Sequence, residues 1–234
     1  MNKKIICYGL LSGLFGVIPP ALGDDDVLAC IEKTSKPFTT ILGFGDSITA
    51  GVPYVSTSWS GNGCRCATDS SCCAGYEPTL EALLQRSYPN TVVVNWGVPG
   101  ETTGDGLSRL SSALWASRPS HVLLMEGTND LWWVDPATVV TNLQSMAQLV
   151  IAAGALPILG TLTPDTRTGS DAKPIAATNL LINNIVKTNS YIISFQDQVL
   201  SASWSSLTYD GLHPNSTGYA YMAQTWYNTL MYGH

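Results

Sequence analysis

Charged residues are scarce in this chain of 234 residues. Only 12% are Asp, Glu, Lys or Arg, which is about half of the usual quarter, while 45% are hydrophobic. A disordered polyelectrolyte is excluded, because such chains combine high charge with low hydrophobicity. Basic residues are fewer than acidic ones: the chain has 11 Lys and Arg against 17 Asp and Glu, which gives a net charge of −6. We therefore expect no basic surface that binds nucleic acid or anionic lipid.

Motifs of several well-known enzyme classes are missing. The chain has no G-x-x-x-x-G-K-[ST] phosphate loop, no H-E-x-x-H zinc motif and no G-x-S-x-G nucleophile turn. Histidine is also rare, with three residues in all. His121 opens an apolar run and His234 is the last residue, so only His213 lies where a strand-end loop is expected. An imidazole base, if there is one, is His213.

The first 23 residues are typical of a secretory signal peptide. Lys3 and Lys4 precede an uncharged apolar run over 5–18, and the small residues of 21–23 form a cleavage site. An anchored helix is the alternative, but the run ends at Pro19 and is shorter than the roughly 20 residues that a span needs. We expect a single secreted or periplasmic domain over 24–234, without stable membrane insertion.

An exported protein is expected to use its cysteines in disulfides. Cys7 leaves with the signal peptide, and five cysteines remain in an oxidising compartment, where disulfides are expected. A structural zinc site is the alternative for the cluster, but it has no C-x2-C spacing and no histidine nearby. Another alternative is lipoprotein anchoring at Cys30, because residues 27–30 loosely resemble a lipobox. The pairing stays open among Cys30, Cys64, Cys66, Cys72 and Cys73.

The chain alternates short apolar runs with longer amphipathic ones, which is typical of βαβ units around a parallel sheet. The expected strands are Thr39–Phe44, Thr91–Trp96, His121–Met125, Leu156–Gly160 and Tyr191–Phe195. The expected helices are Thr79–Ser87, Thr103–Ala116, Ala137–Ala153, Ala176–Thr188 and one after Pro214. A Cys-rich insertion at 52–76 is too long for an ordinary connection of such a fold. It is either a lid or substrate loop, or a disulfide-stapled surface insertion.

Ser47 is the candidate nucleophile. It follows the apolar strand pattern that ends at Phe44, and open α/β sheets bind ligands at the carboxyl ends of their strands. At the start of a helical turn its backbone N–H lacks an intrahelical partner, so it is available to an oxyanion. The alternative is an ordinary N-cap serine.

His213 lies three residues after Asp210, with Gly211 between them to permit a tight turn. The carboxylate would then fix the imidazole tautomer and stabilise the imidazolium that forms during proton transfer. Pro214 suits the first position of the closing helix, which places His213 at the N-cap. A D-x-x-H pattern is also common in loops without function, and that alternative remains.

Two further strand ends offer hydrogen-bond donors at the same edge. Gly100 follows the second expected strand and presents a backbone N–H, while Asn129 follows the third and presents a side-chain amide. Together with the Ser47 amide they would make a three-donor oxyanion hole. Glycine and asparagine are also the commonest turn residues, so each has a purely structural alternative.

From about Thr39 onward, the chain resembles the SGNH, or GDSL-type, hydrolase family in four ordered blocks. The blocks are Gly45–Gly51, Pro99–Thr103, Gly127–Asp130 and Asp210–Pro214. The resemblance implies a three-layer, flavodoxin-like α/β fold with a five-stranded parallel sheet flanked by helices. It implies Ser47, His213 and Asp210 as a catalytic triad, and Gly100 and Asn129 with the Ser47 amide as the oxyanion hole. The insertion at 52–76 departs from the family pattern.

The expected function is a secreted serine hydrolase that cleaves carboxylic esters, of the esterase or lipase kind, through an acyl-enzyme. This chemistry needs no metal and no cofactor. The substrate is a small-molecule or polysaccharide ester, and apolar and aromatic walls suit acyl chains, aryl groups or sugars. Candidate substrate-binding residues are Trp132, Trp133, Tyr54 and Trp59. Two alternatives stay open: a carbohydrate O-deacetylase that uses the same site, and a non-catalytic glycan-binding module.

Overall fold

The computed structural model describes residues 37–55, 59, 61–66, 72, 74–170, 173–189 and 191–233. The predicted signal peptide, Cys30, Cys73 and His234 lie outside these ranges. Within them, no helix has the length and apolar composition needed to cross a membrane.

Six strands form one sheet in the order β2-β3-β1-β4-β5-β6. Five of them are the predicted strands and pair in parallel, within one or two residues of the predicted bounds. The predicted count of five is wrong by one, because Cys64–Arg65 of the insertion pairs antiparallel with β3. A strand of two residues in a Ser-, Gly- and Cys-rich stretch shows no alternation that could reveal it. The strands are β1 Thr40–Gly45, β2 Cys64–Arg65, β3 Val92–Gly97, β4 His121–Met125, β5 Leu156–Gly160 and β6 Ile192–Ser194.

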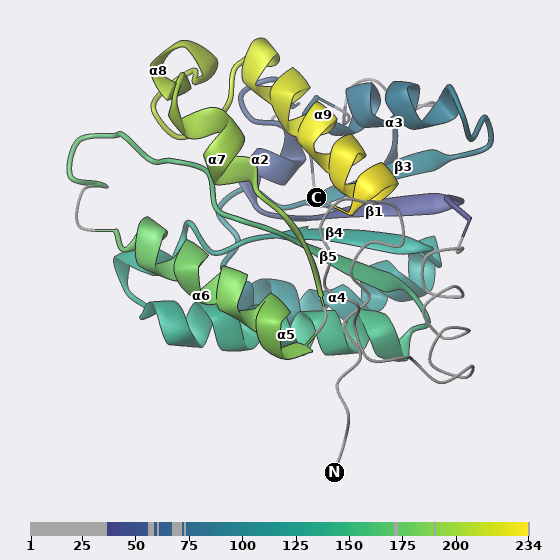
Figure 1. Cartoon of the computed structure of the whole chain (residues 1–234), viewed down its shortest axis with the longest axis horizontal. Coiled ribbons are helices and arrows are strands. Elements are labelled where there is room, and N and C mark those ends of the chain that lie inside the picture. The colour runs from purple at the N-terminus through teal and green to yellow at the C-terminus, as the bar shows by residue number, and fades with distance from the viewer. Residues whose placement is uncertain are drawn as a thin grey trace, which may run out of the picture.

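Helices cover both faces of the sheet (Figure 1), as the apolar character of the strands predicts. One face carries α4, α5 and α6, and the other carries α3, α7 and α9. Each face has its own apolar core: Leu143 and Met146 belong to the first, and Trp226 and Tyr76 to the second. The helices are α2 Ser47–Ala50, α3 Glu77–Gln85, α4 Thr103–Ser117, η1 Asp130–Trp132, α5 Pro136–Ala152, α6 Ile175–Asn189, α7 Gln196–Ser201, α8 Trp204–Leu207 and α9 Ser216–Tyr232.

The strand order places a topological switch point beside β1. Counting the parallel strands alone, the chain runs from β1 to β3 on one side of it, and then crosses to β4 on the other. In such sheets the loops that leave the carboxyl ends of these strands diverge and form a crevice. The register joins Gly45 to Gly97 and to Met125, so the three ends are level. The loops that carry Ser47, Gly100 and Asn129 therefore begin side by side at the same edge of the sheet.

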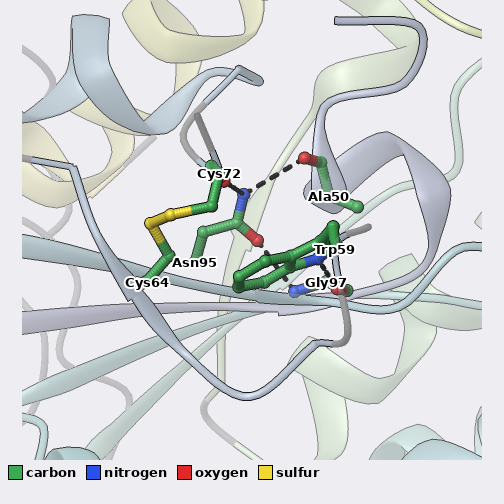
Figure 2. The surroundings of a disulfide bond; sticks show 6 residues. All are labelled: Ala50, Trp59, Cys64, Cys72, Asn95 and Gly97. Carbon is green, nitrogen blue, oxygen red and sulfur yellow. Dashed lines mark hydrogen bonds between the residues drawn. A yellow bond between two sulfur atoms is a disulfide. The ribbon is translucent and has the colours of Figure 1, made fainter. Parts of the chain in front are cut away.

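The Cys-rich insertion is attached to the edge of the sheet at β3 (Figure 2). Cys64 and Cys72 form a disulfide, and Cys66 is also disulfide-bonded, which confirms the prediction of disulfides over zinc for these residues. Buried Asn95 of β3 donates from Nδ2 to the carbonyls of Cys72 and Ala50, at 3.3 Å each. The described part of the insertion is thus tied both to the sheet and to the end of α2.

Candidate active site

Ser47 is the first residue of α2, directly after the turn that ends β1. The N-cap is Asp46, whose carboxylate accepts from the Ile48 N–H at 2.9 Å. The alternative reading of Ser47 as the cap is therefore wrong, and its hydroxyl is left for other contacts. Gly45 permits the close approach of β4 at the end of β1, because a Cβ at this position would overlap the carbonyl oxygen of Met125.

His213 and Asp210 lie in a tight loop before α9. The loop is closed by an isolated bridge between Thr208 and Pro214, and the Tyr209 N–H donates to the His213 carbonyl at 2.7 Å. Gly211 has a φ of +94°, a left-handed conformation that favours glycine. The Asp210 carboxylate therefore folds back to accept from the backbone N–H of His213 at 2.8 Å.

The predicted position of His213 at the start of the last helix is wrong. Helix α9 begins at Ser216, and its N-cap is Asn215, whose side chain accepts from the N–H groups of Thr217 and Gly218. Pro214 belongs to the bridge with Thr208 rather than to the first helical turn. The preference of proline for a first helical position is shared with extended and turn positions, so sequence could not separate them.

Three side chains from opposite ends of the chain form a continuous hydrogen-bonded series. The Ser47 Oγ lies 3.0 Å from His213 Nε2, and His213 Nδ1 lies 2.7 Å from Asp210 Oδ2. An ionised carboxylate only accepts hydrogen bonds, so the proton of a neutral ring is on Nδ1. Nε2 is then an acceptor that points at the serine hydroxyl. This arrangement can remove a proton from Ser47 and return it.

The Asp210 carboxylate is held in its charged form. Partial burial alone would raise the pKa of Asp210, but hydrogen bonds from the His213 backbone, the His213 ring and the Leu212 backbone outweigh burial and lower it. Asp210 therefore stays ionised across the neutral range and stabilises the ring when it is protonated.

Gly100 and Asn129 lie on the loops that leave β3 and β4. Gly100 is exposed and has a φ of +82°, which explains the glycine there. Asn129 donates from Nδ2 to the Glu101 carbonyl at 2.9 Å, so the amide is oriented by the neighbouring loop. An amide nitrogen has two hydrogens, and the second remains for a ligand.

The same two loops are locked together by Asp130 and Thr103. The Asp130 carboxylate accepts from the Thr103 N–H at 2.9 Å and from the Thr103 hydroxyl at 2.5 Å. The Glu101 carboxylate forms an ion pair with Arg109, whose guanidinium also stacks over the Phe44 ring at 4.1 Å. The structure thus gives Glu101 a structural role.

The four predicted aromatic substrate contacts divide into two kinds. Trp132 and Trp133 are 42% and 90% exposed, and Tyr54 is about half exposed. Trp59 instead packs on the cluster of Cys64 and Cys72 and donates from Nε1 to the Gly97 carbonyl at 2.8 Å. Trp59 anchors the insertion (Figure 2), whereas the other three present ring surface to solvent.

Buried Lys173 and Asp165 next to this site were not predicted from sequence. Both side chains are fully buried and pair at 2.8 Å. Lys173 Nζ also donates to the Thr128 carbonyl at 2.9 Å, one residue before Asn129. A single lysine in a loop carries no pattern in the sequence, so no signal could have found it.

The family model for the GDSL-like lipase/acylhydrolase family matches residues 44–221, which includes all four blocks. The chain belongs to this family. Its curated relatives include an arylesterase of Vibrio mimicus, 32% identical over 130 residues, and the esterase TesA of Pseudomonas aeruginosa, 33% identical over 121 residues. These alignments cover 54% and 51% of this chain, and 56% and 52% of the relatives. The chain thus spans about half the length of either one.

An acetylxylan esterase of Geobacillus stearothermophilus is 25% identical over 170 residues, which cover 64% of this chain and 78% of that protein. Its crystal structure matches with a TM-score of 0.70 at 20% identity, over 83% of this chain and 94% of that one. An alpha/beta hydrolase from the metagenome of Lake Arreo, Spain, matches with a TM-score of 0.71 at 18% identity, over 85% and 98%. The structural matches establish a shared fold.

Proposed function

We propose that the protein is a secreted serine hydrolase that cleaves carboxylic esters. The observation that carries this proposal is the hydrogen-bonded series from Asp210 through His213 to Ser47. It joins residues 166 positions apart in the chain at the carboxyl edge of the sheet. Membership of a lipase and acylhydrolase family supports the same chemistry.

The mechanism follows from the positions of these groups. His213 Nε2 takes the Ser47 proton as Oγ attacks the ester carbonyl, and the ring becomes imidazolium beside the Asp210 carboxylate. The N–H groups of Ser47 and Gly100 and the Asn129 amide stabilise the oxyanion. Collapse breaks the bond to the alcohol, which leaves with the proton from His213. Water then attacks the acyl-enzyme by the same proton transfers and releases the acid.

Substitution of Ser47 by alanine tests the proposal. We expect kcat/KM for p-nitrophenyl acetate to fall by about 10⁴- to 10⁶-fold, because the nucleophile is lost while the oxyanion donors remain. A fluorophosphonate should label the wild-type protein on the peptide that contains Ser47. Ser112→Ala, at an exposed position of α4, serves as the matched control with unchanged activity.

A non-catalytic glycan-binding module gives the opposite results. It predicts no labelling by the fluorophosphonate and glycan binding that is unaffected by Ser47→Ala. Either a Ser47→Ala variant with wild-type turnover or label on another residue would refute the proposed role of Ser47.

Carbohydrate O-deacetylation is the second candidate, with the same catalytic residues. The exposed indoles of Trp132 and Trp133, three and four residues after Asn129, favour it, because aromatic rings stack on sugars. The acetylxylan esterase among the relatives supports it. Release of acetate from acetylated xylan, compared with hydrolysis of p-nitrophenyl esters of increasing acyl length, separates a deacetylase from a general esterase.

Export is supported by the Cys64–Cys72 disulfide, because structural disulfides persist in oxidising compartments. Residues 1–23 fit a secretory signal peptide, with a charged start, an apolar run and small residues up to Gly23. Mass spectrometry of the protein from the culture medium should show a mature chain that begins at Asp24. Retention of residues 1–23 in a cytoplasmic product would contradict export.

A further inference from the structure

A buried cation lies under one face of the exposed Trp132. The Lys173 ammonium is 4.4 Å from the centroid of the Trp132 ring. Its side chain has no solvent exposure and its Nζ is held by the Thr128 carbonyl and the Asp165 carboxylate, at 2.9 and 2.8 Å. Charged side chains are rarely buried unless they are paired, so this lysine has a specific structural task.

The Lys173 pair connects the loops of the active site. Asp165 also binds the Arg167 guanidinium, and hydrogen bonds from Arg167 and Lys173 overcome burial and lower the pKa of Asp165 to about 2. The next residue, Thr166, donates its N–H to the Gly211 carbonyl at 2.9 Å. One charged cluster thus braces the Asp210–His213 loop on one side and the Thr128–Asn129 turn on the other.

Trp132 itself is the last residue of the short helix η1, whose backbone is held by contacts at both ends. Asp130, at the start of η1, is bound to Thr103, and its carbonyl accepts from the Trp133 N–H at 2.8 Å. The indole is still 42% exposed. With an ammonium on one face, the exposed part of the ring is a flat, pre-oriented surface three residues from Asn129.

We propose that Trp132 is the platform on which a ring of the ester substrate stacks, aryl or pyranose, and that the Lys173–Asp165 pair is the positioning element that holds it. This inference rests on the proposed function, because it assigns the substrate contact of that same site. Aromatic side chains bind flat rings by contact of their faces, and a platform held in place loses little conformational entropy on binding.

Ring selectivity provides the test. The measured quantity is kcat/KM for phenyl acetate, and for an acetylated xylo-oligosaccharide, each divided by kcat/KM for ethyl acetate. We expect Trp132→Ala to reduce at least one of the two ratios about tenfold, chiefly through KM. The ratio that falls identifies the ring as aryl or sugar. Trp115→Ala is the matched control, since this tryptophan is 78% exposed near the far end of α4.

Lys173→Met tests the positioning role. It should lower the same ratio by a similar factor, and adding it to Trp132→Ala should cause no further loss, because both changes remove one platform. Full additivity of the two losses would overturn the role of Lys173. Thermal unfolding of each variant shows whether it is folded.

A binding measurement is independent of turnover and of the Lys173 variants. In the Ser47→Ala background, an acetylated xylo-oligosaccharide or phenyl acetate should change tryptophan fluorescence, and Trp132→Phe should weaken that change and the affinity. Unchanged selectivity and unchanged binding in the Trp132 variants would overturn the inference while ester hydrolysis by Ser47 stands. Absence of any Ser47-dependent hydrolysis would instead refute the proposed function.

Discussion

The proposed role of Asn129 combines a hydrogen bond within the loops with a hydrogen bond to the oxyanion. One hydrogen of its amide bonds the Glu101 carbonyl, which fixes the direction of the other. We predict that Asn129→Ala lowers kcat for p-nitrophenyl acetate by about 10²- to 10³-fold with little change in KM, the usual effect of losing one oxyanion donor. Steady-state kinetics of the purified variant provide the measurement.

The control for this variant is Asn228→Ala, which removes an exposed amide of α9. Its kcat should equal that of the wild type. A wild-type kcat in Asn129→Ala would remove Asn129 from the oxyanion hole and leave it a turn residue.

Asp46, the cap of α2, is buried. Burial raises the pKa of Asp46 to about 7, against the opposing effect of the Ile48 N–H. The folded state therefore keeps this proton up to about pH 7, whereas the unfolded chain loses it near pH 4. The free energy of unfolding must fall as pH rises between these values.

Asp46→Asn keeps a capping oxygen but cannot titrate. We predict that its stability relative to the wild type grows between pH 4.5 and 7.5, by about 3 kcal/mol for the raised pKa of Asp46. Urea unfolding at both pH values measures this difference. Asp135→Asn, at the exposed cap of α5, should show a constant difference, because hydrogen bonds lower the pKa of Asp135. Equal differences for Asp46→Asn at both values would contradict the prediction.

The described part of the insertion has little secondary structure of its own and is held by disulfides, among them Cys64–Cys72. Its strand β2 has only two residues, and the Cys64–Cys72 bond closes a loop with a sequence separation of 8. Chain entropy predicts that Cys64→Ser with Cys72→Ser lowers the free energy of unfolding by about 2–3 kcal/mol. Urea unfolding of the double variant provides the test.

The double serine variant also separates the two readings of the insertion. A loss of stability with unchanged kcat/KM fits a stapled surface insertion, while a loss of activity as well fits a substrate loop. A stability equal to that of the wild type would contradict the prediction.

The molecule as a whole should be most stable in mildly acidic solution. Burial raises the pKa values of Asp46, Glu77 and Glu126, so the folded state holds protons that the unfolded chain releases as pH rises above about 4. Asp165 and Asp210 have lowered pKa values and act in the opposite sense at lower pH. We predict that the melting temperature is higher at pH 5 than at pH 8 and falls again below pH 4. A melting temperature that rises from pH 5 to pH 8 would contradict this.

Much of the fold could be predicted because parallel strands covered on both faces are continuous apolar runs. His121–Met125 and Leu156–Gly160 have the same bounds in the structure as in the prediction. Short elements were not predicted from the sequence. The strand β2 and the small helices α7 and α8 are too short to show a hydrophobic period. The start of α9 was misplaced because Asn215 and Pro214 both suit a helix start, and only contacts with the preceding loop separate them.

By itself, the sequence determined the fold class and the identities of Ser47, His213 and Asp210 as candidates, because hydrophobic period and local motifs are properties of neighbouring residues. Only the tertiary structure decided that Ser47 and His213 meet at 3.0 Å, that Asp46 rather than Ser47 caps α2, and that Lys173 lies beneath Trp132. These relations depend on strand order and on loop closure over long separations, and no local pattern in the chain encodes them.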